Sequence, residues 1–314
     1  MRNTQTMKLS RKNFLLTSTG VTLNPVFAFA SNPLSLQKTY PISSNVYNWF
    51  TFYKREGKEW GKDWDTCIKE YTQSGLTAIE PSFSTLNDVQ VLLPVLDKYK
   101  ISIPSVYANS VLHKKEEGRK SIETILSIAE VIKNHGTKIL VTNPTPIRWG
   151  GDEVKTDAEL SVQLENLEAL GAQLKKFGIT LAYHTHATEM MGGAKEFHHM
   201  LQNTSKENVS YCFDVHWVFR GSQDSALAVY DVLKMYGDRI VELHLRQSID
   251  GVWSETFGAG DIDYTKIAMG LKKLQLRPHL VIEQCIEDKT VVNLNVVEAH
   301  KRDLIFVKKV FDWT

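Results

Sequence analysis

Four short apolar runs in the second half of the chain each end in a side chain that can bind a metal ion: His184, Asp214, His244 and Glu283. The runs begin near positions 179, 210, 240 and 280. This spacing leaves room for a helix between consecutive runs, so we expect parallel strands whose C-terminal ends meet at one place. Imidazole and carboxylate donors that converge in this way are typical ligands of Mn²⁺, Zn²⁺, Co²⁺ or Fe²⁺. The pattern predicts one divalent metal ion.

Other polar side chains belong to the same strand ends. Residues alternate between the two faces of a strand. His186 therefore shares the inward face of His184, His216 that of Asp214, and Arg246 that of His244. A further carboxylate, Glu80, closes an earlier strand-like run and is expected in the same ring.

Strand-like and helix-like segments alternate from residue 40 onward, which predicts an α/β protein with a (β/α)8 TIM barrel fold. Three expected helices, including 156–177, stop at or next to a glycine, as helices often do. The expected strands are 45–51, 76–82, 101–107, 138–143, 179–186, 210–216, 239–246 and 279–285. The expected helices are 63–74, 85–99, 118–135, 156–177, 193–204, 223–237, 263–276 and 291–311.

Composition excludes some classes of function. The chain has 314 residues, 42% of them hydrophobic, and a net charge of +1. Four of its 37 Lys and Arg lie in the first 30 residues, which leaves 33 against 36 Asp and Glu and gives no electrostatic footprint for nucleic acid. The three cysteines, an odd and widely spaced set, are expected to be buried and free.

Residues 1–30 have the pattern of an export signal. A basic stretch precedes a weakly apolar segment, and Ala28-Phe29-Ala30 supplies a small-x-small cleavage site. The stretch around Arg11 and Lys12 resembles a twin-arginine signal with Lys12 in place of the second arginine, and an ordinary secretory signal is the alternative. Either signal predicts a periplasmic or secreted protein. No later stretch is long and apolar enough to predict a membrane span.

A divalent ion at this site would polarise a carbonyl and its neighbouring hydroxyl, which acidifies the adjacent C–H bond. Glu283 is expected both to bind the ion and to move a proton, with His186, His216 and Glu80 as further candidates for acid–base catalysis. Arg246 either holds a substrate oxygen or pairs with Glu242. Aromatic residues after the strand ends could stack on a sugar: Trp149, Trp217, Trp253 and Tyr107.

The chain resembles the sugar phosphate isomerase/epimerase superfamily, the xylose isomerase-like barrels, over roughly residues 40–311. The resemblance rests on Leu-Ala-Tyr-His184-Thr-His186, Cys-Phe-Asp214-Val-His216-Trp, Glu-Leu-His244-Leu, Phe-Gly-Ala-Gly-Asp-Ile-Asp and Leu-Val-Ile-Glu283. It implies that residues 31–314 are a single barrel domain and that one ion, most often Mn²⁺, is held by Asp214, His244 and Glu283 together with His184.

Two positions depart from the family pattern. His184 stands where ketose epimerases have a proton-transferring Glu, and Trp217 stands where the family often has a His, with His216 one residue earlier. These changes place symmetric two-carboxylate epimerisation in doubt and fit β-elimination, hydration or enolisation as well.

The function predicted first is a metal-dependent isomerase or epimerase acting on an unphosphorylated sugar or keto-sugar. The alternatives are a lyase or hydratase on a 3-keto-glycoside, a non-catalytic periplasmic sugar-binding protein, and an apurinic endonuclease-like phosphodiesterase. The predicted partner is a small carbohydrate, with no nucleic acid and no membrane span, and a homo-oligomer is compatible with this reading.

Overall fold

The computed structural model describes residues 39–313, and within them eight parallel strands form one sheet in the order β2-β1-β10-β7-β6-β5-β4-β3. Backbone hydrogen bonds from Ile79 to Ser102 and from Tyr107 to Pro81 bring the two ends of this sheet together. The predicted (β/α)8 barrel is therefore confirmed. The predicted export signal lies outside the described residues.

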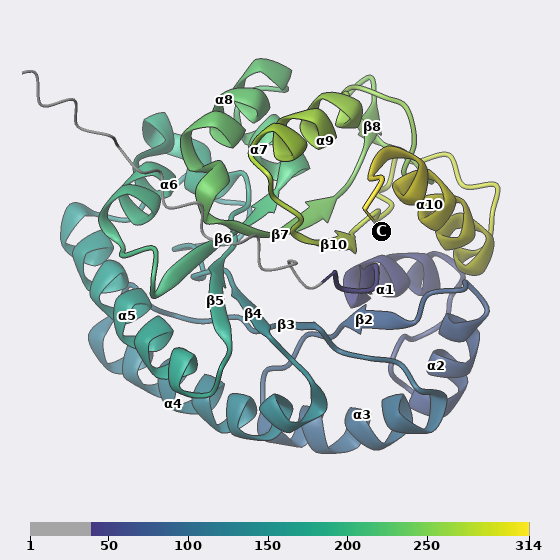
Figure 1. Ribbon diagram of the computed structural model, residues 1–314, viewed down its shortest axis with the longest axis horizontal. Coiled ribbons are helices and arrows are strands. Elements are labelled where there is room, and N and C mark those ends of the chain that lie inside the picture. The colour runs from purple at the N-terminus through teal and green to yellow at the C-terminus, as the bar shows by residue number, and fades with distance from the viewer. Residues whose placement is uncertain (1–38, 314) are drawn as a thin grey trace, which may run out of the picture. The chain divides into compact units, whose positions relative to one another are not determined.

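The strands lie at the centre and the helices surround them, as α3, α4 and α5 do along one side in Figure 1. The barrel strands are β1 (Ser43–Asn45), β2 (Ala78–Glu80), β3 (Ser105–Tyr107), β4 (Ile139–Thr142), β5 (Thr180–Tyr183), β6 (Val209–Asp214), β7 (Ile240–Leu245) and β10 (His279–Ile282). The helices are α1 (Val46–Arg55), α2 (Trp64–Thr72), α3 (Leu86–Tyr99), α4 (Lys115–Ile132), α5 (Asp157–Lys176), α6 (Met191–Asn203), α7 (Val215–Gly221), α8 (Ala226–Tyr236), α9 (Tyr264–Lys273) and α10 (Val296–Val310).

The helices bury apolar stripes against the sheet. In α5 the buried residues include Leu160, Leu167, Leu170 and Leu174, which recur at helical spacing, and Thr156 caps the helix by accepting a hydrogen bond from the Glu159 amide. The three cysteines are buried and unpaired, as expected. Among the described residues, no helix combines the length and apolar character that a bilayer crossing needs.

Two expected strands are wrong at their C-terminal ends. The segment 45–51 was expected to be a strand, but α1 begins at Val46 because the Asn45 side chain accepts a hydrogen bond from the Tyr47 amide. The segment 210–216 stops as a strand at Asp214, whose side chain accepts from the Trp217 amide and caps α7. In both cases a capping side chain starts a helix where aromatic and β-branched residues resemble a strand.

A short hairpin follows β7 and carries one of the predicted substrate-binding residues. It consists of β8 (Ser248–Ile249) and β9 (Val252–Trp253). The Asp261 carboxylate holds it by accepting hydrogen bonds from the Ser248 hydroxyl (2.6 Å) and from the amides of Asp250 and Gly251. Gly260 lies so close to the Ser248 carbonyl that a Cβ would overlap it. The Gly-Ala-Gly-Asp stretch therefore packs against the hairpin and stabilises it.

Candidate metal centre and active site

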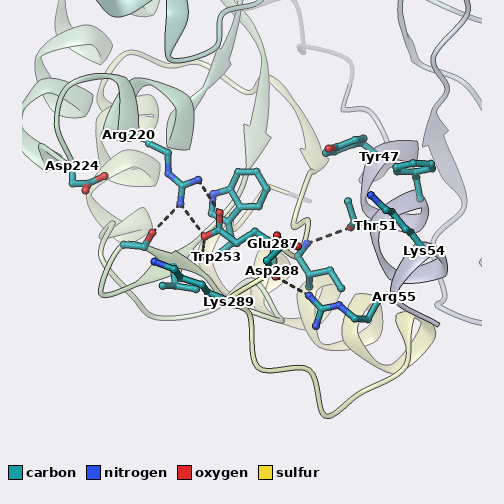
Figure 2. A pocket seen from close by; sticks show the side chains of 14 residues that line it. Tyr47, Thr51, Lys54, Arg55, Arg220, Asp224, Trp253, Glu287, Asp288 and Lys289 are labelled. Atoms are coloured by element: carbon teal, nitrogen blue, oxygen red, sulfur yellow. Dashed lines mark hydrogen bonds and ion pairs between the residues drawn. The ribbon is translucent and has the colours of Figure 1, made fainter. Parts of the chain in front are cut away.

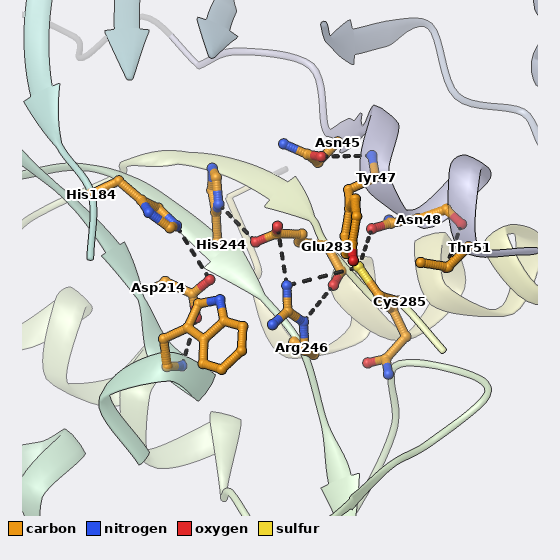
Figure 3. A network of polar contacts seen from close by, with 12 residues as sticks. Asn45, Tyr47, Asn48, Thr51, His184, Asp214, His244, Arg246, Glu283 and Cys285 are labelled. Carbon is orange, nitrogen blue, oxygen red and sulfur yellow. Dashed lines mark hydrogen bonds and ion pairs between the residues drawn. The ribbon is translucent and has the colours of Figure 1, made fainter. Parts of the chain in front are cut away.

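The four predicted metal ligands meet at the C-terminal ends of their strands. One ligand atom from each of His184, Asp214, His244 and Glu283 lies within 4.8 Å of the others, and all four residues are buried. The strand register produces this meeting, because Asp214 is paired with His244 and the Glu283 amide donates to the Leu245 carbonyl at 2.9 Å. Figure 3 shows the side chains turned toward one another from separate strands.

The donor set fits a divalent cation. His184 Nε2 and Asp214 Oδ2 face each other at 3.4 Å, yet neither atom has a hydrogen-bond partner. Buried polar atoms left in this state are costly unless another group satisfies them. A cation between two imidazoles and two carboxylates would satisfy both, and this mixture suits the later first-row metals. The cluster is therefore a group that could hold one metal ion.

The charges of the cluster are set by burial and by one arginine. Burial raises the pKa of Asp214 to about 7, although Arg246 opposes the shift. Burial also acts on Glu283, but Arg246 and His244 outweigh it and hold the pKa of that carboxyl well below its usual range. Burial and the neighbouring His244 lower the pKa of His184 to about 3. His184 is therefore a neutral imidazole, the form that binds metals.

Arg246, predicted to hold a substrate oxygen or to pair with Glu242, lies beside the cluster. It pairs with Glu283 instead: its Nη2 lies 3.0 Å from Glu283 Oε1 and its Nε donates to the Glu283 carbonyl at 2.9 Å. Its guanidinium lies over the rings of Trp217 (5.1 Å) and Trp253 (4.3 Å). The buried Nη1 has no partner. Arg246 is thus a fixed cation with one free donor.

A cavity of about 610 Å³, here called the site cavity, opens next to the cluster. Of the four cluster residues, only Glu283 lines it. The predicted substrate-binding residues Arg246, Trp217, Trp253 and Tyr107 all line it as well. Its wall is completed by Asn45, Tyr47, Ser82, Asn109, Trp149, Gly150, Gly151, Asp152, His186, Ala187, Thr188 and Met191. Aromatic faces beside a few polar groups are typical of a pocket for a small polar ring.

His186 is brought into the site cavity as a neutral imidazole. Its ring lies 4.8 Å from that of His184 and is enclosed by Trp149 (5.1 Å) and Trp217 (5.2 Å). Burial lowers the pKa of His186 to about 3, and its Nδ1 has no hydrogen-bond partner. The Glu189 carboxylate fixes this segment by accepting from the His186 amide at 2.6 Å. At neutral pH the ring is therefore unprotonated, which a base must be before it can accept a proton.

His216 is not brought to the cluster, so the expectation that it faces inward with Asp214 is wrong. The chain has already turned into α7, and alternation along a strand no longer applies. His216 Nε2 lies 3.0 Å from the Ser248 hydroxyl, the ring contacts Trp253, and the residue does not line the site cavity. Its position suits support of the β8–β9 hairpin.

Glu80 reaches the cluster from within the barrel. Its Oε2 lies 3.2 Å from His244 Nε2, whereas Glu283 contacts the other ring nitrogen, Nδ1, at 2.9 Å. Burial raises the pKa of Glu80 to about 7, and the side chains of Asn45 and Ser105 donate to it. Glu80 does not line the site cavity, so it acts on the cluster through His244 and does not contact a ligand in the cavity.

A second polar layer lies deeper in the barrel, and of its members only Glu242 was considered in the sequence. Glu242 lies between His244 Nε2 (3.3 Å) and His279 Nδ1 (2.7 Å), and Ser43 contacts His279 at 2.9 Å. Cys212, Glu242 and His244 also lie close enough to share an ion. Burial raises the pKa of the Cys212 thiol well above its ordinary value, which makes this a poorer ligand set than the first.

Comparison with known proteins places the chain in a family. A model of the xylose isomerase-like TIM barrel matches residues 68–309. The chain belongs to the xylose isomerase-like TIM barrel family. An inosose dehydratase of Clostridium perfringens (strain 13 / Type A) is 26% identical in an alignment of 265 positions that covers 76% of this chain and 86% of the relative.

Solved structures share the fold of this family. L-ribulose 3-epimerase has a TM-score of 0.67 at 13% identity, covering 87% of this chain and 94% of its own. A sugar phosphate isomerase/epimerase from Parabacteroides distasonis ATCC 8503 has a TM-score of 0.64 at 17% identity, covering 89% and 97%. The resemblance to this superfamily seen in the sequence is therefore confirmed.

Reasoning from the sequence missed one aromatic residue of this site, Tyr47, whereas Trp149 was among the aromatic residues expected at the strand ends. Tyr47 lies on α1, in a segment expected to be a strand, and its ring lines the site cavity. Trp149 follows β4 and encloses His186. The signal for Tyr47 was available in Asn45, a residue type that favours the start of a helix.

Proposed function

We propose that the protein is a metal-dependent enzyme that removes a proton next to the carbonyl of an unphosphorylated sugar or keto-sugar. The observation that carries this proposal is the convergence of His184, Asp214, His244 and Glu283 beside a cavity that Arg246 and His186 line, each of which has a buried polar atom without a partner. The family and its sugar-directed relatives support the class of substrate.

The four converging residues would hold one divalent ion, with Mn²⁺ the first candidate. When bound, such an ion supplies Lewis-acid polarisation of a carbonyl and its adjacent hydroxyl. The neutral His184 and the charged Glu283 are already in the protonation states that binding requires, and Asp214 loses its proton readily near neutral pH. His244 must lose a proton to bind, because the effect of burial is outweighed by the surrounding acidic groups, which raise its pKa well above the usual range.

The remaining residues of the cavity bind the substrate and transfer protons. Arg246 Nη1 donates to a substrate oxygen, and its attachment to Glu283 keeps that donor in place. His186 Nδ1 accepts the proton that leaves the carbon. Trp217 and Trp253 line the cavity beside the substrate and exclude water.

The charge of the cavity supports an unphosphorylated substrate. Among the described residues that line it, Arg246 is the one side chain with a permanent positive charge, and it is already paired with Glu283. A phosphate group usually needs several free donors or cations. A neutral polyhydroxylated ketone fits this lining better.

Two outcomes of proton abstraction fit the site. Return of the proton to the other face or neighbouring carbon gives isomerisation or epimerisation, and loss of a β-hydroxyl group gives dehydration. Dehydration is supported by the match to inosose dehydratases. It is also supported by His184. This residue stands where the ketose epimerases have a proton-transferring carboxylate, which symmetric epimerisation needs in addition to the first.

The test is isotope exchange in D₂O. The mature protein, with Mn²⁺ and after chelation, is incubated with ketoses, inososes and 3-keto-glycosides, and deuterium next to the carbonyl and loss of water are followed by NMR and mass spectrometry. His186→Gln should abolish the exchange, whereas His198→Gln on α6, whose ring is bound to Tyr236, should not. Absence of exchange with every substrate, or exchange that chelation leaves unchanged, would reject the proposal.

We also propose that the protein acts outside the cytoplasm, on the support of the signal-like residues 1–30 alone. Expression of the full chain followed by fractionation tests this proposal. The expected product is shortened after Ala30 and is recovered from the periplasm or medium.

A further inference from the structure

A second cavity, of about 830 Å³, adjoins the site cavity. It is formed by α1, the β8–β9 hairpin and the segment that follows β10 (Figure 2). Tyr47 and Trp253 line both cavities, so the two share a wall made of aromatic rings. The two cavities are therefore neighbours, and a ligand in the site cavity reaches the border of the second cavity at these two rings.

The shared wall is rigid. Arg246 from the site cavity and Arg220 from the second cavity both lie over the Trp253 ring, at 4.3 and 4.8 Å. Glu287 accepts two bonds from Arg220 and one from the Trp253 amide at 2.8 Å. These contacts fix the hairpin without filling the space on the side of Arg220.

The second cavity exposes aromatic surface. Tyr47 and Phe50 stack on each other with ring centroids 5.8 Å apart and planes 18° apart. Their exposed fractions are 48% and 44%, which is high for two large aromatic residues beside a catalytic pocket. Exposed apolar surface that borders a cavity marks a binding site. The C–H face of a sugar ring is a good partner for such rings.

The polar groups of the second cavity are of both signs. No hydrogen bond or ion pair joins Lys54, Lys289, Asp224 or Asp288 to another side chain within residues 39–313. Arg220 is neutralised by Glu287. Unpaired ammonium and carboxylate groups can donate to and accept from the hydroxyl groups of a neutral sugar, which suits such a ligand.

We propose that the second cavity binds the second ring of a glycoside, so that the substrate is an oxidised glycoside of at least two units and not a free monosaccharide. This inference rests on the proposed function, because the oxidised ring must occupy the site cavity. Phe50 marks the new subsite, since it lines the second cavity and not the first.

Comparison of two substrates tests the proposal: the 3-keto derivatives of glucose and of maltose. Wild type should convert the maltose derivative with a kcat/KM at least about 10-fold higher, and Phe50→Ala should reduce that ratio by about 5-fold or more through KM. Ile305→Ala, which truncates an exposed apolar side chain on α10 away from both cavities, should leave the ratio unchanged. Equal rates for the two substrates, or a ratio that Phe50→Ala does not alter, would overturn the proposal.

Binding measured without turnover separates this inference from the proposed function. Isothermal titration with methyl α-maltoside and methyl α-glucoside should show tighter binding of the maltoside, and Phe50→Ala should remove the difference. If neither keto-sugar reacts but the maltoside preference is present and depends on Phe50, the reaction is wrong and the subsite stands. If the keto-sugars react but no maltoside preference appears, the subsite is wrong and the reaction stands.

Discussion

The guanidinium of Arg246 is held by several contacts and keeps one nitrogen without a partner. We therefore expect the planar shape of the guanidinium to contribute more to activity than its positive charge alone. A carboxylate, a carbonyl and two indole rings hold the guanidinium plane in place. A lysine has no plane to stack and offers one charged nitrogen in place of a fork. We expect Arg246→Lys to lower kcat/KM on the order of 100-fold, the usual effect of removing one well-placed donor at a developing negative charge.

Steady-state kinetics in the presence of saturating Mn²⁺ measure this effect. Arg119→Lys is the control, because Arg119 lies exposed on α4 and lines neither cavity. A rate for Arg246→Lys within a factor of about three of wild type would show that charge alone is sufficient.

A substitution at Asp214 tests whether this residue is a metal ligand. Its Oδ2 is buried without a partner, while its Oδ1 caps α7 through the Trp217 amide at 2.8 Å. Asp214→Asn retains an oxygen for the cap and removes the charge, so we expect Mn²⁺ affinity to fall by about 100-fold or more with the fold intact. Metal content after dialysis and far-UV circular dichroism check both parts, with the exposed Asp231→Asn as control. Unchanged occupancy would refute the ligand assignment.

At the scale of elements, the sequence predicted the strands and helices well but not every junction between them. Hydrophobic spacing is sufficient for α5, whose leucines form one buried stripe. It is not sufficient at Asn45 or Asp214, where one capping side chain decides that a helix begins. His216 lies just after Asp214, where β6 ends and α7 begins. Because this residue was predicted to be part of the strand, its side chain was wrongly expected to face the metal cluster.

Close packing of α5 on the segment before β6 depends on a glycine. A Cβ at Gly171 would overlap the backbone carbonyl of Asn208, which cannot rotate away as a side chain can. We expect Gly171→Ala to lower the free energy of unfolding by about 1–3 kcal/mol despite the better helix propensity of alanine. Gly118→Ala on α4 is the control, because the added methyl meets only the movable amide of Asn166. Urea denaturation that shows equal stability for the two variants would contradict this view.

His300 couples α10 to α1 in a manner that depends on pH. Its Nδ1 donates to the Val296 carbonyl at 2.8 Å, and Nε2 lies 3.2 Å from the Asn48 amide on α1. Burial lowers the pKa of His300 to about 4, so the folded state holds the neutral ring while an unfolded histidine titrates near 6.5. Its contribution is complete above about pH 6.5 and is lost as the pH falls toward 4, by up to about 3 kcal/mol.

His300→Gln should be less sensitive to acid for this reason. The stability difference between wild type and His300→Gln is expected to shrink as the pH falls from 7 to 4, as measured by denaturant unfolding at each pH. Parallel stability curves for the two proteins would show that His300 does not titrate as its burial indicates.

At the scale of the whole molecule, the site could be predicted because parallel strands in a barrel end at one face. His184, Asp214, His244 and Glu283 are separated by a hundred residues in sequence, yet their positions at strand ends were enough to predict that they meet. Features that depend on loops and on the barrel interior were not predictable in this way. Tyr47 joins the cavity through a helix, and the Glu242–His279 contact depends on the register between two strands, which the sequence pattern does not set.

One ion in this cluster would connect β5, β6, β7 and β10, which form a continuous half of the sheet order. A ligand that binds only the folded state stabilises it by about 4 kcal/mol at 1,000 times its Kd. For a domain of this size the midpoint of thermal unfolding should rise on the order of 10 °C with Mn²⁺ and fall back after chelation. Asp214→Asn should show no such rise, whereas Asp231→Asn should respond as wild type does. Equal midpoints with Mn²⁺ and with chelator would mean that the four donors do not act together as a metal site, whatever their separation in the folded protein.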